Sequence, residues 1–162
     1  RHTQLYKPDI IIAQMHWGEE FLTTPSIRQK SLADFLLRNG VRIIIGHHPH
    51  VVQPVVVEKG EDGIHNVVYY SLGNFVSNQQ RRHTDGGMLA EIVISRKEAD
   101  SPVVIESCDY SLVWVQKLRR HGKVDFRLIP SQEEDRPSMN EEDKQKMNNF
   151  VLDVERIVQQ GL

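Results

Sequence analysis

Three histidines stand close together in residues 46–50, which read Gly-His-His-Pro-His. They directly follow an apolar segment, residues 41–45, that is typical of a buried strand. In extended backbone, residues two apart project to the same side, so we expect His48 and His50 to converge and His47 to point away. The intervening proline is expected to keep His48 extended. Closely spaced imidazoles suit Zn, Mn, Fe or Ni, and the pattern predicts a divalent metal site. Local hydrogen bonding within a loop is the alternative.

His16 follows another apolar segment, residues 10–14, which also reads as a strand buried on both faces. Residues 26–39, between the two strands, carry apolar side chains near helical spacing and end before a glycine. Strand, helix and strand with short connections favour a right-handed βαβ unit with parallel strands. Both strands then end at one edge of the sheet, so His16 is predicted to join His48 and His50 there. A structural role is the alternative for His16.

Other polar residues are weaker candidates. Glu19 and Glu20 come just after the first histidine and are interpreted as parts of a solvated loop. Asn74 offers an amide that could orient a substrate oxygen, and a structural turn is an equal alternative. Arg81 and Arg82 suit bidentate binding of a carboxylate or phosphate group, with a solvated loop as the alternative.

The remaining sequence is rich in β-strand patterns and ends in a helix. Its predicted strands cover residues 51–58, 64–70, 88–96, 103–117 and 124–129, and its predicted helix covers residues 141–160 behind Asn140 as N-cap. The fold class is therefore α/β with mixed strand directions. We expect one domain over residues 1–130, followed over residues 131–162 by a polar linker and an amphipathic helix that packs on it.

Composition narrows the classes of function. The 162 residues are 39% hydrophobic and 26% charged, as in globular domains, and the net charge of −2 gives no basic field for nucleic acid. No apolar run approaches the roughly 18 residues of a membrane span. The single cysteine, Cys108, excludes an intrachain disulfide. Because the chain begins without Met and enters a strand almost at once, we expect it to be part of a longer protein.

Three motifs, residues 16–20 (HWGEE), 46–54 (GHHPHVVQP) and 70–75 (YSLGNF), stand in this order along the chain. In order and spacing they resemble the bacterial capsule-synthesis (CapA) family, which looks like a branch of the calcineurin-like metallophosphoesterases. The similarity is close over residues 9–76 and loose beyond. It implies two metal ions at the carboxyl edge of a βαββ sandwich. By resemblance, His16 matches the penultimate metal motif of that family, and His48 and His50 match the final one.

The sequence also departs from the family pattern. Family members carry upstream Asp, Glu and Asn-His motifs that supply the remaining ligands, and none of these motifs precedes Asp9 here. A site for two ions needs more donors than three imidazoles. We therefore expect the chain on its own to bind metal weakly, to lack hydrolytic activity, and to self-associate through an uncovered sheet edge or face.

The resemblance implies a metal-dependent hydrolase of the phosphoesterase type in capsule synthesis. Its substrate would be a phosphoester or an anionic polymer such as poly-γ-glutamate, bound with help from Arg81 and Arg82. One of His16, His47 or His50 would shuttle a proton, and Asn74 would orient the substrate. The alternative is a subunit without enzymatic activity that handles the polymer in a synthesis or export complex at the membrane. In both cases the full-length protein is expected outside the cytoplasm, at the cell envelope.

Overall fold

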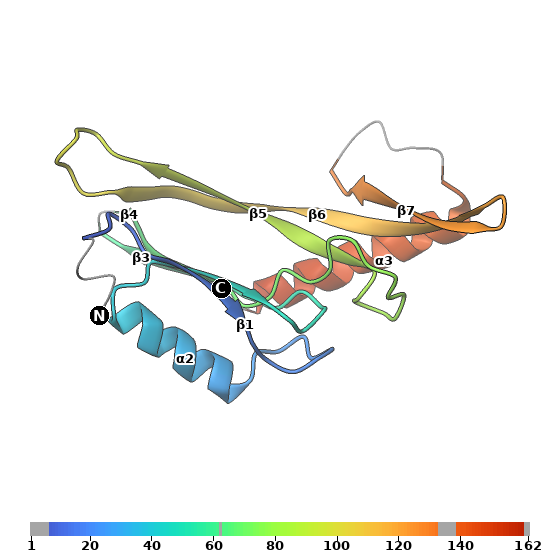
Figure 1. Ribbon diagram of the computed structural model, residues 1–162, viewed down its shortest axis with the longest axis horizontal. Helices are drawn as coiled ribbons and strands as arrows, with labels where there is room; N and C mark the ends of the chain where they lie inside the picture. Colours follow the sequence, from blue (N-terminus) through green and yellow to red (C-terminus); the bar gives the residue numbers. More distant parts are fainter. Residues whose placement is uncertain (1–6, 62, 133–138, 161–162) are drawn as a thin grey trace.

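The computed structural model describes residues 7–61, 63–132 and 139–160, which form a seven-stranded sheet and two helices (Figure 1). The strand order is β1-β2-β4-β6-β5, with β3 paired to β4 and β7 paired to β6. The strands are β1 Ile12–His16, β2 Ile43–His47, β3 Val55–Gly60, β4 Gly63–Tyr69, β5 Gly86–Ser95, β6 Val104–Arg120 and β7 Lys123–Pro130. The helices are α2, Ile27–Arg38, and α3, Glu141–Gln159. This arrangement confirms the predicted α/β class.

The first elements form the predicted βαβ unit. β1 and β2 are parallel neighbours, and His16 lies opposite His47 in their register. α2 connects them and begins at Ser26, whose hydroxyl accepts a hydrogen bond from the backbone N–H of Gln29 at 3.2 Å. The side-chain oxygen of Gln29 accepts in return from the backbone N–H of Ser26 at 3.0 Å, which completes a capping box. Gly40, with φ +89°, follows the helix end as predicted.

β1 corrects two details of the prediction. The strand lies two residues later than predicted, so His16 is its last residue rather than part of the following loop. It is also not buried on both faces, because Ile12 is 49% exposed and Gln14 is exposed as well. Within the described residues β1 pairs only with β2, and α2 packs on one of its faces. An apolar run shows that a strand can be buried, but coverage depends on the elements around it.

The centre of the sheet is covered on both faces. Side chains alternate across a strand, and in β2 Ile43 and Ile44 are both fully buried. Ile43 belongs with Tyr69 to the core that contains α3 residues, whereas Ile44 belongs with Val68 to the core that contains α2 residues. The two faces of β2 and β4 are therefore buried in different cores, one shared with α2 and the other continuous with the core along α3. This coverage explains why the sequence of β2 shows no polar alternation.

The hairpin of β3 and β4 forms as predicted, with an irregular register between Glu58 and Lys59. β3 begins later than the predicted strand over residues 51–58, because residues 51–54 form a buried connection instead. β4 then pairs in parallel with β2, which places the chain after β4 beside the loop after β2. The backbone N–H of Leu72 donates to the Gly46 carbonyl at 3.1 Å and fixes this neighbourhood.

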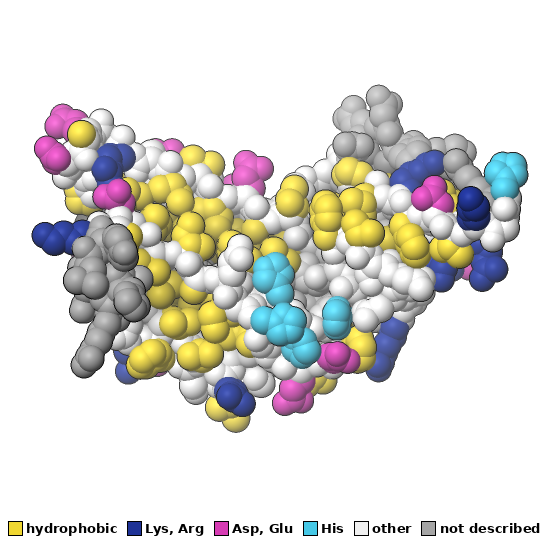
Figure 2. Space-filling view, in the orientation of Figure 1, with side chains coloured by type: hydrophobic (Ala, Val, Ile, Leu, Met, Phe, Trp, Pro, Cys, Tyr) yellow, Lys and Arg dark blue, Asp and Glu magenta, His cyan; other side chains and the backbone are white. Residues whose placement is uncertain are grey.

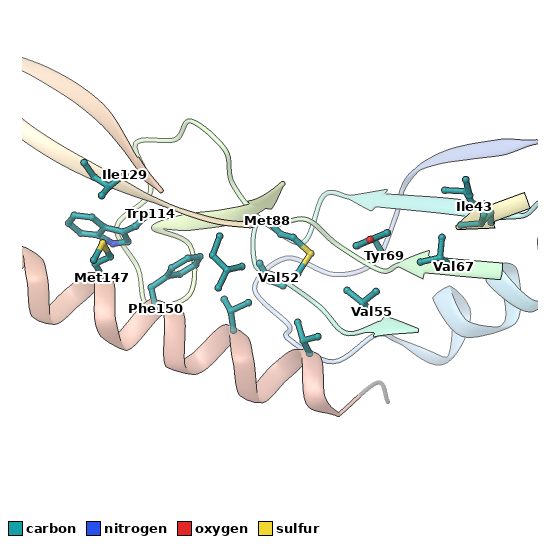
Figure 3. Packing of buried hydrophobic residues seen from close by; sticks show 14 of the residues in the cluster. Ile43, Val52, Val55, Val67, Tyr69, Met88, Trp114, Ile129, Met147 and Phe150 are labelled. Carbon is teal, nitrogen blue, oxygen red and sulfur yellow. The ribbon is translucent and has the colours of Figure 1, made fainter. Parts of the chain in front are cut away.

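The other half of the sheet is a long ribbon of β5, β6 and β7, along which α3 lies (Figure 1). α3 begins at the predicted N-cap, where the Asn140 side chain accepts from the Asp143 N–H at 2.7 Å. Met147 and Phe150 of α3 share a core with Trp114 and Ile129 of the ribbon (Figure 3). Neither α2 nor α3 of the described chain is long and apolar enough to span a membrane. The predicted division into domains at residue 130 stays a prediction.

Candidate metal centre

The histidines gather at the carboxyl edge of β1 and β2. The backbone N–H of Trp17 donates to the His47 carbonyl at 3.1 Å and keeps the two strand ends in register. The imidazole rings of His16 and His48 have centroids 4.5 Å apart, and those of His48 and His50 are 6.1 Å apart. Figure 2 shows histidine side chains gathered near the middle of one face of the molecule, with an acidic side chain beside them.

His48 and His50 converge for a different reason from the one predicted. The prediction assumed extended backbone and a proline that holds His48 extended, but φ is +100° at His48 and +61° at His50. Both residues therefore occupy positive-φ conformations within a tight turn, which L-residues adopt only when their surroundings compensate the strain. One such compensation is a hydrogen bond from the Phe21 N–H to the Pro49 carbonyl at 2.8 Å. The turn, and not strand alternation, brings the two rings to one side.

Gly46 permits this turn to lie close to the chain that follows β4. A Cβ atom at Gly46 would stand 2.0 Å from the Tyr70 carbonyl oxygen and 2.5 Å from Nε1 of Trp17. The indole N–H of Trp17 itself donates to that carbonyl at 2.8 Å. The three segments that follow β1, β2 and β4 therefore meet at one point, where only glycine fits.

Glu20 is the residue that sequence reasoning missed. Its carboxylate and the imidazoles of His48 and His50 offer ligand atoms that all lie within 4.8 Å of one another. The sequence places Glu20 in a solvated loop, and the residue is exposed in the structure. The available signal was its position in a loop that must open on the histidine edge. One carboxylate and two imidazoles are a donor set that fits Zn, Mn, Fe or Ni.

A buried amide pair holds the loop that carries Glu20. The side chain of Gln29, 2% exposed, donates to the side-chain oxygen of Gln53 at 2.8 Å. The amide nitrogen of Gln53 donates in turn to the backbone carbonyl of Leu22 at 2.8 Å. These bonds tie α2, the connection before β3 and the loop of Glu20 together. Buried amides need such partners, so the loop geometry is coupled to the packing of α2.

Asn74 lies beside the histidines and is almost buried, with 8% of its surface exposed. Its Oδ1 atom is 3.0 Å from Nδ1 of His50. Its amide nitrogen donates to the Thr84 carbonyl at 2.8 Å and to the Gln79 side-chain oxygen at 3.0 Å. The structure thus places Asn74 against His50, which is a supporting position for a metal-ligating imidazole. Its predicted contact with substrate stays a prediction.

Arg81 and Arg82, predicted together, occupy different surroundings. The Arg81 guanidinium lies 4.9 Å from the ring centroid of Phe21, and that ring is stacked 6.1 Å from the His50 ring. Arg81 therefore stands at the rim of the histidine group, held by a cation–π contact. Arg82 instead makes two hydrogen bonds of 2.9 Å to the carboxylate of Asp153 on α3. The structure gives Arg82 a partner within the protein.

His47, the last residue of β2, is exposed, but its surroundings change its pKa. Partial burial and the neighbouring His16 imidazole both lower the pKa of His47, burial having the larger effect. A lowered pKa favours the neutral ring near pH 7. Next to the group, a cleft of about 640 Å³ runs along the start of α2 and is lined by His16, His48, Glu19 and Arg28, among others. The histidine edge thus borders a hollow with charged and polar side chains in its lining.

The fold and the site define a mixed α/β domain with a candidate metal centre at the carboxyl edge of its parallel strands. Residues 2–79, slightly less than half of the chain, match the family described as bacterial capsule synthesis protein PGA_cap. The resemblance noted from the motifs is therefore confirmed. All the histidines of the cluster, together with Glu20 and Asn74, lie within the matched residues.

Two curated relatives each match about half of the chain. The PGA biosynthesis protein CapA of Bacillus subtilis (strain 168) is 42% identical over 83 residues, which are 51% of this chain and 20% of that protein. The capsule biosynthesis protein CapA of Bacillus anthracis is 41% identical over 83 residues, 51% of this chain and 19% of that protein. The match thus covers about a fifth of the length of each relative.

Proposed function

We propose that this chain forms part of a metal-dependent hydrolase of the phosphoesterase type that acts in capsule synthesis. The observation that carries the proposal is the convergence of Glu20, His48 and His50, whose ligand atoms lie within 4.8 Å of one another. The names of the relatives, which refer to capsule and PGA biosynthesis, support a role of this activity in capsule synthesis.

Each residue of the cluster has a distinct proposed role. Glu20, His48 and His50 hold a divalent ion, and His16, whose ring lies 4.5 Å from that of His48, completes the set or ligates a second ion. Such an ion would acidify a water molecule and neutralise charge on the group under attack. His47, with its lowered pKa, is suited as a neutral imidazole to accept a proton.

The proposed substrate is anionic. Arg81 stands at the rim of the cluster, where its guanidinium can pair with a carboxylate or phosphate group. We propose a phosphoester or an anionic polymer such as poly-γ-glutamate, handled at the cell envelope by a longer protein with a membrane partner or a second copy of the chain. Nucleic acid is not a proposed substrate, because the chain carries a net charge of −2 and no basic field.

A second candidate is a polymer-handling protein without hydrolytic activity. The observation that favours it is the modest donor set, since the grouped ligand atoms in the described residues come from one carboxylate and two imidazoles. A clamp for two metal ions needs more donors, including a bridging group. In this case a single ion would bind carboxylates of the polymer without cleavage.

Metal titration of the 162-residue chain tests the proposed metal site. We expect Zn²⁺ or Mn²⁺ to bind in calorimetry, and His48→Ala and Glu20→Gln to weaken this binding at least 10-fold. His65→Ala is the matched control, because it removes an exposed imidazole on β4. Equal affinities of wild type, His48→Ala and Glu20→Gln would overturn the proposed site.

Hydrolysis is tested on the full-length protein with a generic phosphodiester. Turnover that His48→Ala abolishes and His65→Ala preserves supports the hydrolase. Metal binding without turnover, together with retention of poly-γ-glutamate that needs the metal, supports the polymer-handling candidate instead. The 162-residue chain alone is expected to show no appreciable turnover.

A further inference from the structure

The contacts of Asn74 determine which nitrogen of His50 carries the proton. The Asn74 amide nitrogen faces two acceptors, the Thr84 carbonyl and the Gln79 side-chain oxygen. Its oxygen must therefore be the atom that faces Nδ1 of His50 at 3.0 Å. An oxygen can only accept, so Nδ1 of His50 is the donor. The lone pair of His50 then lies on Nε2, the nitrogen that is free to ligate a metal ion.

If the side-chain amide of Asn74 were rotated by half a turn, the proton of the His50 ring would be on the other nitrogen. An N–H group facing Nδ1 would require a lone pair there, and the proton would move to Nε2 of His50. That nitrogen could then no longer act as a ligand without losing its proton. The orientation of Asn74 thus affects metal binding without any contact between Asn74 and the ion.

The Thr84 carbonyl, in turn, depends on a loop that is held from the C-terminal half of the chain. Thr84 is fully buried, and its backbone N–H and its hydroxyl both donate to the Arg81 carbonyl, at 2.9 and 2.7 Å. The next residue, Asp85, accepts a hydrogen bond from the indole N–H of Trp114 at 2.9 Å. Arg82 and His83, the two residues before Thr84, lie close to α3.

Asp153 is the residue of α3 that they reach. It lies on the buried face of the helix, 8% exposed, between Phe150 and Val154 in the pattern of core residues. Its carboxylate accepts two bonds of 2.9 Å from Arg82 and lies 3.3 Å from Nδ1 of His83. A carboxylate on a buried helix face is costly unless it is paired, so this pair fixes the loop on the helix.

We propose that Asp153 is a positioning residue for the metal centre. Through its two hydrogen bonds with Arg82 it holds the Thr84 carbonyl against Asn74, which keeps His50 in the form protonated at Nδ1. Asp153 lies far outside the residues that match the capsule-synthesis family. The inference rests on the proposed metal site, and a readout in metal-free protein tests it separately.

The test compares wild type with Asp153→Asn, which keeps the shape and removes the charge. Glu155→Gln is the control, since it removes one charge from an exposed position on the same helix. Long-range ¹H–¹⁵N NMR of histidine-labelled, metal-free protein reports the protonated nitrogen, and His50→Gln assigns the signal. We expect protonation at Nδ1 in wild type and Glu155→Gln, and a mixture of both forms in Asp153→Asn.

The second readout is metal affinity by calorimetry with Zn²⁺. Asp153→Asn should weaken binding about 10-fold, as the loss of outer support for a ligand commonly does. If Asp153→Asn does not fold, Arg82→Lys replaces it, because it breaks the bidentate pair at a side chain that is 73% exposed. An unchanged His50 signal in the folded variant would overturn the inference. Absence of Zn²⁺ binding by wild type would overturn the proposed function, and the NMR result would still decide this inference.

Discussion

The two halves of the sheet are built in contrasting ways. Around β2 and β4 both faces of the sheet are buried, and side chains as close in sequence as Ile43 and Ile44 belong to different cores. In the ribbon of β5, β6 and β7, α3 packs on one face, and apolar side chains elsewhere stay exposed, such as Leu89 at 54% and Val124 at 46%. The proposed metal ligands lie in the half around β2 and β4. Asp153, which we propose supports them, lies on α3 beside the ribbon.

Because of this difference, the two halves of the sheet are sensitive to different kinds of substitution. In the doubly covered half, backbone segments meet so closely at Gly46 that an added methyl group has no space. In the ribbon, stability depends on a single layer of contacts with α3, centred on Trp114. We therefore expect core substitutions to break the ribbon and small steric changes to break the site.

The largest effect is expected from Trp114→Ala. Trp114 is 1% exposed and also donates to Asp85, so its removal leaves a cavity and a partly buried carboxylate without this hydrogen-bond donor. We expect a loss of about 3–5 kcal/mol in the free energy of unfolding, measured with urea. Leu89→Ala, at an exposed position of the same ribbon, should change it by less than about 0.5 kcal/mol. Similar losses for both variants would contradict the interpretation that the ribbon is stabilised mainly by the face that packs on α3.

Gly46→Ala should have the next largest effect. The added methyl group would meet the Tyr70 carbonyl, so the turn must shift, at a cost of about 1–3 kcal/mol. Metal affinity should fall with it, because the turn carries His48 and His50. Gly40→Ala is the comparison, since it has positive φ but open space around its Cβ position. A smaller loss for Gly46→Ala than for Gly40→Ala would show that the contact is not limiting.

Gln29→Leu tests the buried amide pair. It leaves the side-chain oxygen of Gln53 without its donor and removes half of the capping box, at an expected cost of about 1–3 kcal/mol in chemical denaturation. Gln29→Leu combined with Gln53→Leu should cost less than the sum of the two single losses, because both single variants already lose the same Gln29–Gln53 hydrogen bond. Additive losses in the double variant would mean that the two amides do not act as a pair.

The smallest effect concerns acid stability. Hydrogen bonds from Arg82 and the charge of His83 lower the pKa of Asp153 in the folded protein. A lowered folded pKa means that Asp153 stabilises the fold above its unfolded pKa of about 3.9, and that this contribution is lost as pH falls through the folded value. The stability difference between wild type and Asp153→Asn should be constant near neutral pH and shrink below about pH 4. A stability difference that grows as the pH falls would contradict a lowered pKa of Asp153 in the folded protein.

Much of the architecture could be predicted from local patterns. The N-cap Asn140, the helix between the first two strands, the parallel pairing of β1 with β2, and the histidine edge all follow from local residue patterns and connection length. The predicted convergence of His48 and His50 rested on the wrong backbone geometry, since the turn uses positive φ. Sequence alone shows that a proline stands between them, but not the contact with the Phe21 segment that stabilises the turn.

The sequence by itself determined the helices, the order of the strands along the chain and the presence of a histidine-rich edge, because these depend on neighbours within a few residues. Only the tertiary structure decided that Glu20 joins the histidines, that Arg82 pairs with Asp153, and that β1 keeps one face exposed. The physical reason is distance along the chain. Loops that meet through long-range packing carry no periodic signal, so their partners become visible only when the sheet and helices bring them together.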